Sequence, residues 1–184
     1  LMTTQMATHS ALTHPTICPA CAQPYEQCCG PLHHENAVPS SPEALMRSRY
    51  SAYVLGDYPY ILATYATAPR QQLTVQALAE SAADTRWLGL TVLAASSITT
   101  APSTPSQNNS QCLQGEVEFK VFYAENKRLY CLHERSVFIQ ESGYWRYLDG
   151  TMGDANGEVL LKRNDKCVCG SNKKYKQCCL PKVA

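Results

Sequence analysis

The sequence predicts an α+β domain, with three helices on one face of an antiparallel sheet and a small cysteine-rich module at each end. Apolar residues recur at helical spacing between residues 41 and 82, whereas after Trp87 they alternate with polar residues, as in strands with one buried face. Eight of the ten cysteines lie in two clusters near the ends of the chain. A length of 184 residues suits one domain with small appendages.

Three helices are expected in the first half of the body. The first begins at Ser41, an N-cap followed by Pro42, and ends at Gly56. Its apolar stripe consists of Met46, Tyr50, Tyr53 and Val54. A second helix covers about 58–65, and Thr74 caps a third. These helices supply one apolar layer of the domain.

Four strands are expected in the second half, at residues 88–98, 117–123, 129–140 and 144–148. Turns at Asn126-Lys127 and Ser142-Gly143 join the last three strands into a meander. Residues 96–111 are rich in Ser, Thr, Pro and Asn without periodicity, which predicts a flexible loop. The strands supply the second layer.

The segment near the C-terminus predicts a structural zinc site. Two cysteines one residue apart are followed, after eight residues, by an adjacent pair: Cys167, Cys169, Cys178 and Cys179. Zinc takes four thiolate or imidazole ligands in a tetrahedron. Gly170-Ser171-Asn172 provides a turn, and a short helical turn over 173–177 returns the adjacent pair to the metal. A disulfide is disfavoured because adjacent cysteines form only an awkward bond.

This segment closely resembles the SEC-C motif, the small zinc-binding tail of the SecA translocation ATPase. The pattern of that family is Cys-x-Cys, eight residues, then Cys followed by Cys or His, with Gly-Ser, Lys-Lys and an aromatic residue between. The chain matches it at Cys167, Cys169, Gly170, Ser171, Lys173, Lys174, Tyr175, Cys178 and Cys179. Metal binding is expected to supply most of the folding free energy of so short a segment.

A second cluster near the N-terminus echoes this pattern in altered form. It comprises Cys18, Cys21, Cys28 and Cys29, with a tyrosine three residues before the adjacent pair. The spacing is Cys-x2-Cys followed by six residues, and the Gly-Ser and lysine pairs are absent. Cys-x2-Cys is a good half-site, so a second zinc ion is predicted, with a metal-free knuckle as the alternative. His33 and His34 could replace one cysteine or simply lie exposed.

The formal net charge of +1 is unevenly distributed. Residues 162–184 contain seven Lys or Arg and one Asp, against nine bases and fourteen acids before them. This tail is either a solvated surface around a metal site or a docking surface for an acidic partner. Residues 1–17 lack the features of a signal peptide, and no segment is apolar enough to span a membrane, which favours metal binding in a reducing cytoplasm. The isolated Cys112 and Cys131 are expected to be small apolar residues.

The body carries a second resemblance. Its motifs are Leu45-Met-Arg-Ser-Arg-Tyr50-Ser-Ala52, Trp87-Leu-Gly-Leu-Thr-Val92, Gly115-Glu-Val-Glu-Phe119, Glu134-Arg-Ser-x-Phe138 and Trp145-x-Tyr-x-Asp-Gly150. They are similar to motifs of the bacterial YchJ-like family, whose members carry a SEC-C motif at each end of a nuclear transport factor 2-like domain. The resemblance runs from Cys18 to Cys179. It implies a cone in which a curved antiparallel sheet wraps around helices, and it implies no established activity.

Four parts are therefore predicted. Residues 1–15 are a disordered N-terminus, 16–38 the N-terminal SEC-C-like cluster and linker, 39–160 the nuclear transport factor 2-like domain, and 161–184 the C-terminal SEC-C module. Because residues 41–150 contain their own apolar faces, the body is expected to fold without metal.

A cone of this kind could bind a small molecule or act as an isomerase- or dehydratase-like enzyme. The expected lining residues are Tyr50, Tyr53, Trp87, His133, Arg135, Tyr147 and Asp149. Tyr147 and Asp149 share one strand face by the period of two, as do His133 and Arg135. An Asp–His pair in this pocket could act as a general base. Core packing explains the aromatic residues, and Arg135 can pair with Glu118 across strands. No catalytic residue is assigned, and a non-enzymatic role is favoured.

These observations favour a cytoplasmic, zinc-binding adaptor that recognises an acidic protein partner. The residues expected to contact it are Lys173, Lys174, Tyr175 and Lys176, with the tyrosine as anchor. In SecA the matching module contacts the acidic chaperone SecB, so the resemblance implies a similar recognition role. Single-stranded nucleic acid is an alternative for a basic zinc knuckle, but the acidic body would repel a phosphate backbone. An oligomer formed through the sheet is left open.

Overall fold

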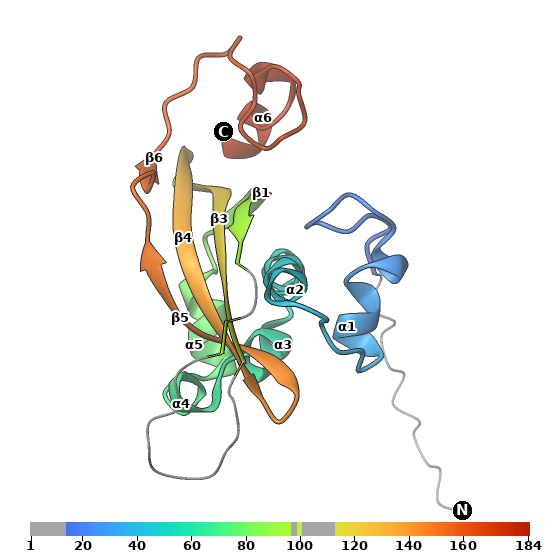
Figure 1. The fold of residues 1–184 in the computed structure, drawn as a ribbon. Helices are drawn as coiled ribbons and strands as arrows, with labels where there is room; N and C mark the ends of the chain where they lie inside the picture. The colour runs from blue at the N-terminus through green and yellow to red at the C-terminus, as the bar shows by residue number, and fades with distance from the viewer. Residues whose placement is uncertain (1–13, 97–98, 101–112) are drawn as a thin grey trace, which may run out of the picture.

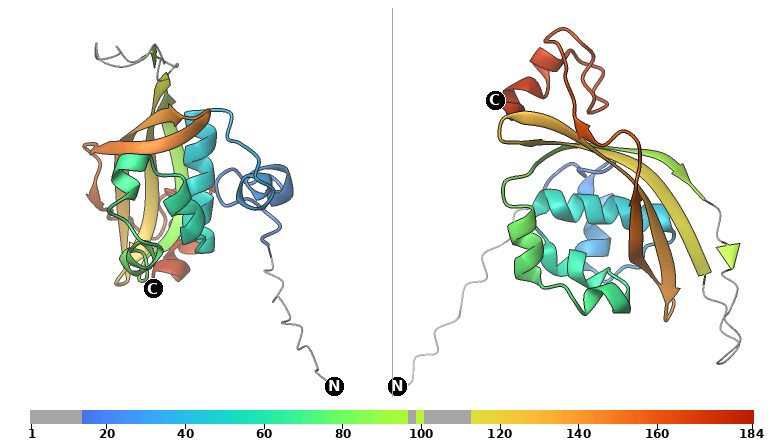
Figure 2. Two further views of the ribbon diagram at one scale, coloured as in Figure 1. Left: turned by 90° about the horizontal axis from the view of Figure 1, so that it is seen from below. Right: turned by 90° about the vertical axis from the view of Figure 1, so that its left-hand side faces the viewer.

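An antiparallel sheet curves around a layer of helices, and a cysteine-rich module lies at each end of the described chain (Figure 1, Figure 2). This computed structural model describes residues 14–96, 99–100 and 113–184. Cys112, most of the expected flexible loop and nearly all of the expected disordered N-terminus lie outside these residues. Among the described helices, none has the length and apolar character needed to cross a bilayer.

The elements follow one another as a helical half and a strand half. The helices are α1 Gly30–His34, α2 Pro42–Leu55, α3 Tyr58–Ala63, α4 Thr67–Arg70, α5 Val75–Ser81 and α6 Leu180–Val183, with 3-10 turns at Tyr25–Gln27 and Tyr175–Gln177. The strands are β1 Arg86–Ala95, β2 Thr99–Thr100, β3 Leu113–Glu125, β4 Arg128–Glu141, β5 Tyr144–Met152 and β6 Gly157–Glu158. The predicted α+β class is confirmed, whereas the single turn α4 was not predicted.

Local sequence signals set the ends of the main helices. Ser41 Oγ accepts a hydrogen bond of 3.1 Å from the amide of Ala44, and Pro42 occupies the first position of α2. Helix α2 ends at Gly56, whose φ of 72° lies in the left-handed region. Thr74 caps α5 in the same way as Ser41 caps α2. The predicted starts of both helices are confirmed.

The four long strands lie in the order β1-β3-β4-β5, and all their pairings are antiparallel. The register between β4 and β5 shifts between Val137, which faces Asp149, and Phe138, which faces Tyr147. Leu148 is therefore an additional residue, a β-bulge that reverses the facing of the side chains that follow it. This bulge changes which residues of β5 reach the interior.

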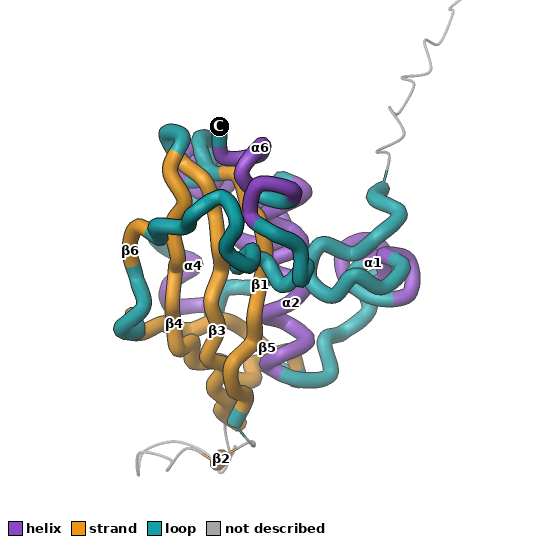
Figure 3. The backbone as a smooth tube through the Cα atoms, turned by 90° about the horizontal axis from the view of Figure 1, so that it is seen from above, coloured by secondary structure: helices purple, strands orange, loops and turns teal. Residues whose placement is uncertain are grey.

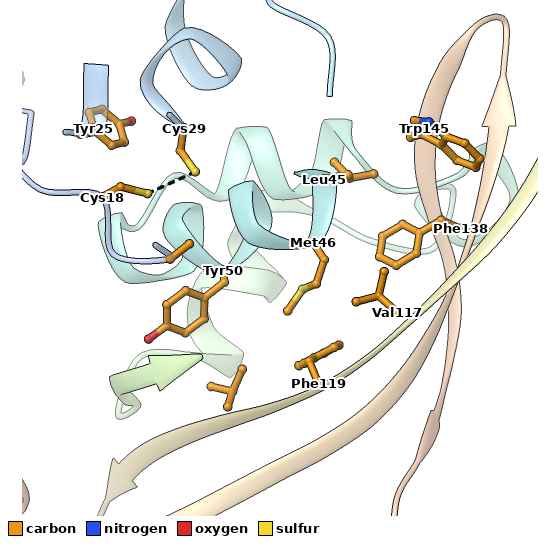
Figure 4. Packing of buried hydrophobic residues seen from close by; sticks show 12 residues of the cluster. Cys18, Tyr25, Cys29, Leu45, Met46, Tyr50, Val117, Phe119, Phe138 and Trp145 are labelled. Atoms are coloured by element: carbon orange, nitrogen blue, oxygen red, sulfur yellow. Dashed lines mark hydrogen bonds between the residues drawn. The ribbon is translucent and has the colours of Figure 1, made fainter. Parts of the chain in front are cut away.

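The main core has α2 at its centre. Met46 and Tyr50 of α2 pack with Phe119 of the concave sheet face, and Cys18 and Cys29 of the N-terminal module face each other beside the helix (Figure 4). Helix α1 lies beyond α2, on the side away from the sheet (Figure 1, Figure 3). The N-terminal module thus shares the core of the body. That the body folds without metal stays a prediction, and this shared core argues against it.

The C-terminal module has a core of its own against the other face of the sheet. Tyr175, Cys179 and Val183 are buried with Ala124 and Leu129 at the β3–β4 hairpin. Residues of β3 alternate between the two cores, which agrees with the period of two. The two modules therefore lie against different parts of the domain, and we expect each to respond separately to a substitution.

Candidate metal centres and cavity

The four cysteines of the C-terminal cluster converge on one point. Their sulfur atoms all lie within 4.8 Å of one another, with 3.3 Å between Cys169 and Cys178 and 3.8 Å between Cys178 and Cys179. A tetrahedral zinc site with Zn–S bonds of about 2.3 Å places its sulfur atoms about 3.8 Å apart. The cluster therefore has the ligand type, number and approximate spacing of a structural zinc site.

Left-handed backbone brings the two cysteine pairs together. Gly170 has a φ of 85° and Asn172 a φ of 61°, so the expected tight turn is present. The Ser171 hydroxyl lies 3.0 Å from Cys178 Sγ and supports the turn from inside. The helical turn that follows is shorter than predicted and covers only Tyr175–Gln177.

The C-terminal cluster rests on β1 at Gly89. A Cβ atom at this position would lie 3.1 Å from both Cα and the carbonyl oxygen of Cys169. Backbone atoms cannot rotate away as a flexible side chain would, so a larger residue here would push the module a few tenths of an ångström away from the strand. Arg86 on the same strand donates a hydrogen bond of 3.2 Å to the carbonyl oxygen of Lys182.

Replacing Gly89 with alanine is therefore expected to weaken the docking of the C-terminal module. A forced contact of this kind costs about 1–3 kcal/mol, which corresponds to metal loss roughly 5- to 150-fold faster if docking limits release. The measurement is the rate of zinc transfer to a colorimetric chelator. Thr91→Ala, at an exposed position of the same strand, serves as control and is expected to release zinc at the native rate. Equal rates for native protein and Gly89→Ala would contradict this role.

The N-terminal cluster is built in a similar way and is closed by helix α2. Cys18 and Cys29 lie 3.4 Å apart, Cys21 and Cys28 3.0 Å, and Cys28 and Cys29 3.8 Å, measured between sulfur atoms. Cys18, Cys28 and Cys29 form the group whose sulfurs all lie within 4.8 Å, and Cys21 joins it through its contact with Cys28. The buried hydroxyl of Ser51 lies 3.4 Å from the sulfurs of both Cys18 and Cys29. Three sulfurs at this spacing, with a fourth in contact with one of them, provide the ligand type and number of a four-cysteine zinc site.

The two histidines beside this cluster serve the fold. His33 Nδ1 lies 2.6 Å from the Tyr25 hydroxyl, and its Nε2 lies 2.9 Å from the carbonyl oxygen of Ser48. His34 Nε2 contacts the same hydroxyl at 3.0 Å. Burial holds the pKa of His33 below its usual value, which favours the neutral ring. The hypothesis that a histidine replaces a cysteine is not needed, and the expectation that both are exposed is wrong for His33.

The two modules follow the same backbone path. The amide of Cys18 donates to the carbonyl oxygen of Gln23 at 2.7 Å, and the amide of Cys167 donates to that of Lys173 at 2.8 Å. In both modules a 3-10 turn that begins at a buried tyrosine follows. The cysteine after the turn has nearly the same backbone conformation in each module, with φ −130° and ψ −97° at Cys28 and φ −130° and ψ −93° at Cys178. The modules are therefore a structural repeat despite their different first spacing.

The sulfur atoms of each cluster share their protons unequally. The hydrogen bond between Cys18 and Cys29 lowers the pKa of Cys18 to about 4. Burial opposes ionisation of Cys169, but hydrogen bonds from Ser171 and its neighbours outweigh it and lower the pKa to about 6. Burial raises the pKa of Cys179. Each cluster thus contains one cysteine with a lowered pKa and at least one with a raised pKa, and a divalent cation would favour the thiolate form of each.

A cavity of about 230 Å³ lies between α2, α5 and the concave face of the sheet. Most of its wall is aromatic or aliphatic, and the aromatic residues are Tyr50, Tyr53, Tyr65, Trp87, Phe119 and Tyr147. Its polar groups come from Arg49, Ser81, Glu134 and Ser136. Arg49 and Glu134 are both more than nine-tenths buried. The cavity is therefore an apolar chamber with one cation and one carboxylate in its wall.

Comparison with protein families matches residues 41–150 to a model described as the YchJ middle NTF2-like domain. The chain belongs to the YchJ-like family. Residues 163–181 match the SEC-C motif, a module of the zinc-binding type, in agreement with the cysteine cluster found there. Both resemblances drawn from the sequence are thereby confirmed.

Relatives in this family are similar over nearly their whole length. A UPF0225 protein from Vibrio parahaemolyticus is 38% identical over 174 residues, covering 88% of this chain and 97% of the relative. A UPF0225 protein from Shewanella is 41% identical, and the match covers 92% of this chain and 99% of the relative. A SEC-C motif containing protein from Rhodopseudomonas palustris, solved in solution, has a TM-score of 0.64 at 31% identity, covering 75% and 99%. A crystal structure from Psychrobacter arcticus has a TM-score of 0.57 at 30% identity, covering 89% and 94%.

Four of the seven residues predicted to line the cavity do so: Tyr50, Tyr53, Trp87 and Tyr147. His133 and Arg135 lie instead on the opposite face of β4, where both contact Glu118 at 2.8 Å and 3.1 Å. These two hydrogen bonds hold the pKa of the Glu118 carboxyl below its usual value. The predicted pairing of Arg135 with Glu118 is confirmed, and the placement of His133 and Arg135 in the cavity is wrong.

Asp149 does not line the cavity either. The bulge at Leu148 turns it outward, where it is exposed and accepts a hydrogen bond of 2.8 Å from the amide of Gly150. The suggested Asp–His general base is therefore wrong, because neither residue reaches the cavity. The polar residues that do reach it, Arg49 and Glu134, were missed. Counting back by twos from the buried Phe138 would have placed Glu134 on the inner face.

The three lysines of the predicted partner surface lie at exposed positions of the C-terminal turn. Tyr175, between Lys174 and Lys176, is only 6% exposed and packs in the core of the module. The expectation that its ring anchors a partner is wrong, since it is already buried by its own chain. Lys173, Lys174 and Lys176 would have to act without it.

Proposed function

We propose that this protein is a zinc-binding adaptor that holds one zinc ion in each cysteine cluster and recognises an acidic protein partner through the lysines of its C-terminal module. In this proposal Cys18, Cys21, Cys28 and Cys29 bind one ion, and Cys167, Cys169, Cys178 and Cys179 bind the other. Four-cysteine sites leave no open coordination position, which is typical of structural zinc. This supports a role in shaping a surface, not in catalysis.

The main support for a partner surface is that the lysines occur in only one of the two copies of the repeat. The positions of Lys173, Lys174 and Lys176 in the C-terminal module correspond to Gln23, Pro24 and Glu26 in the N-terminal module. The same backbone path therefore forms without any of the lysines. Because the fold does not require them, a binding role explains their concentration on one turn better than stability does.

The surroundings of the lysines also favour a docking role. Among the residues that the structure describes, none of the three forms an ion pair with an acidic side chain. The turn that carries them ends at two zinc ligands, so metal binding would hold its backbone rigid and lower the entropy lost on docking. Three neighbouring charges would steer an acidic partner and fix its orientation.

The test is capture of partners from cell extract by native protein and by two triple variants, with the captured proteins identified by mass spectrometry. Changing Lys173, Lys174 and Lys176 to Glu is expected to lower recovery of an acidic protein at least about tenfold, since each reversed contact becomes repulsive. Zinc content is expected to stay unchanged.

The matched control changes the same three lysines to Arg, which keeps the charge and is expected to keep the capture. Arg70→Glu with Arg146→Glu alters net charge at positions outside the module and is also expected to have no effect. Recovery that survives the triple Glu variant would contradict the proposal. Recovery that is lost on nuclease treatment would instead assign the surface to nucleic acid.

A further inference from the structure

The cavity contains two buried charges of opposite sign that do not pair with each other. Arg49 on α2 is 5% exposed and Glu134 on β4 is 8% exposed, and no ion pair joins them within 4.0 Å. Burying a charge is costly unless other groups compensate it. Each of these two charges is compensated only in part by its own surroundings.

One nitrogen of the Arg49 guanidinium, Nη1, is held by hydrogen bonds. Its Nη1 donates hydrogen bonds of 3.0 Å to the carbonyl oxygen of Ile61 and 2.6 Å to Thr64 Oγ1. Its guanidinium carbon lies 4.4 Å from the ring centre of Tyr65 and 4.8 Å from that of Tyr147. Within the described residues, Nε and Nη2 of Arg49 form no hydrogen bond with the protein. Every fully buried polar side-chain atom among these residues does have a hydrogen-bond partner, so Nε and Nη2 are not fully buried. These two donors therefore keep some exposed surface, and Arg49 is one of the residues that line the cavity.

Glu134 presents a matching acceptor. Its Oε1 accepts hydrogen bonds of 2.8 Å from the Tyr147 hydroxyl and 2.7 Å from the Ser136 hydroxyl. Burial and the neighbouring carboxylate raise the pKa of Tyr147, so its hydroxyl stays a donor at neutral pH. Oε2 bonds no described protein group and by the same reasoning keeps some exposed surface, and Glu134 is one of the residues that line the cavity. One wall thus offers fixed donors and another wall a fixed acceptor.

We propose that this cavity binds a small zwitterion with an apolar body, such as an α-amino acid with an aromatic or branched side chain. The carboxylate would accept from Arg49, the ammonium group would donate to Glu134, and the body would pack against Trp87 and Phe119. Charge-assisted hydrogen bonds are strong in such a low-dielectric setting. A volume of about 230 Å³ lies below the range of about 300–1,000 Å³ for larger ligands, so the ligand is small. None of the residues that line this site is a proposed zinc ligand or belongs to the lysine surface.

The first test uses native protein and three probes that differ in one charge: L-phenylalanine, 3-phenylpropanoate and 2-phenylethylamine. Binding is followed by calorimetry and by tryptophan fluorescence, because Trp87 lines the cavity and Trp145 does not. L-Phenylalanine is expected to bind saturably, and each analogue at least about tenfold more weakly, since a buried partner loses its charged contact. L-Leucine and L-methionine are tested as well, because the apolar side chain of the ligand could be aliphatic instead of aromatic.

The second test replaces Glu134 with Gln, which keeps the shape and removes the charge. This substitution is expected to weaken the binding of L-phenylalanine at least about tenfold and to leave the affinity for 3-phenylpropanoate unchanged. Glu118→Gln, on the opposite face of the sheet, is the matched control and is expected to bind all probes as native protein does. If Glu134→Gln does not fold, the probe series on native protein decides. No saturable binding of the three amino acids up to about 10 mM, or equal binding of zwitterion and analogues, would overturn the proposal.

Discussion

Replacing Cys29 with serine is expected to lower the free energy of unfolding of the whole domain by about 3–5 kcal/mol. Cys29 is 1% exposed and belongs to the same core as Met46 and Tyr50 of α2. Its sulfur also contacts the buried hydroxyl of Ser51 on that helix. Loss of the metal would therefore loosen the packing of α2 as well as the N-terminal module. The measurement is denaturant unfolding followed by tryptophan fluorescence.

Cys131→Ser is the matched control, because Cys131 is a buried cysteine outside both clusters, as the sequence predicts for an apolar residue. Its replacement introduces a hydroxyl at a similarly buried position and is expected to lower the free energy of unfolding by only about 1–2 kcal/mol. Equal costs for Cys29→Ser and Cys131→Ser would mean that no metal links the N-terminal cluster to the core. A much larger cost for Cys29→Ser supports a metal site there.

Replacing Cys178 with serine is expected to have a large but local effect. The C-terminal module has its own small core of Tyr175, Cys179 and Val183, and so short a segment is expected to depend on metal for most of its stability. The variant is expected to lose the C-terminal zinc ion, and amide hydrogen exchange over residues 163–183 is expected to become at least about 100-fold faster. Helix α2 is expected to keep its native protection because it packs mainly in the other core.

The matched control is Gln177→Ala, an exposed position next to Cys178, which is expected to keep both zinc content and protection. Unchanged zinc content in Cys178→Ser would remove Cys178 from the ligand set. Loss of protection in α2 would show instead that the two modules are coupled through the sheet. The contrast between Cys29→Ser and Cys178→Ser thus separates an integral module from a peripheral one.

Much of the fold could be predicted from short-range signals. The caps at Ser41 and Thr74 and the stop at Gly56 act within a few residues of the chain, so the sequence states them directly. The strand faces depend on register, which is set by long-range pairing. The bulge at Leu148 shifts that register by one residue, and it moved Asp149 from the predicted cavity to the surface.

The cysteine clusters were easier to predict than the cavity for a similar reason. Cysteine spacing is a local property, and it indicated both clusters that the structure brings together. Glu134 lies between His133 and Arg135 in a strand with polar and apolar residues on both faces, so polarity alone could not tell which face is inside. Tyr175 looked like a surface anchor because it lies among lysines, although a buried tyrosine begins the same turn in both modules.

The most direct test of the proposed zinc-binding adaptor is the metal stoichiometry of the native protein. Native mass spectrometry, checked by elemental analysis, measures both the number and the identity of bound ions on the intact chain. Two zinc ions per chain are expected, falling to one in Cys29→Ser and to one in Cys178→Ser. A native protein that carries no zinc, or a single ion that only Cys178→Ser removes, would contradict the assignment of a metal to each module.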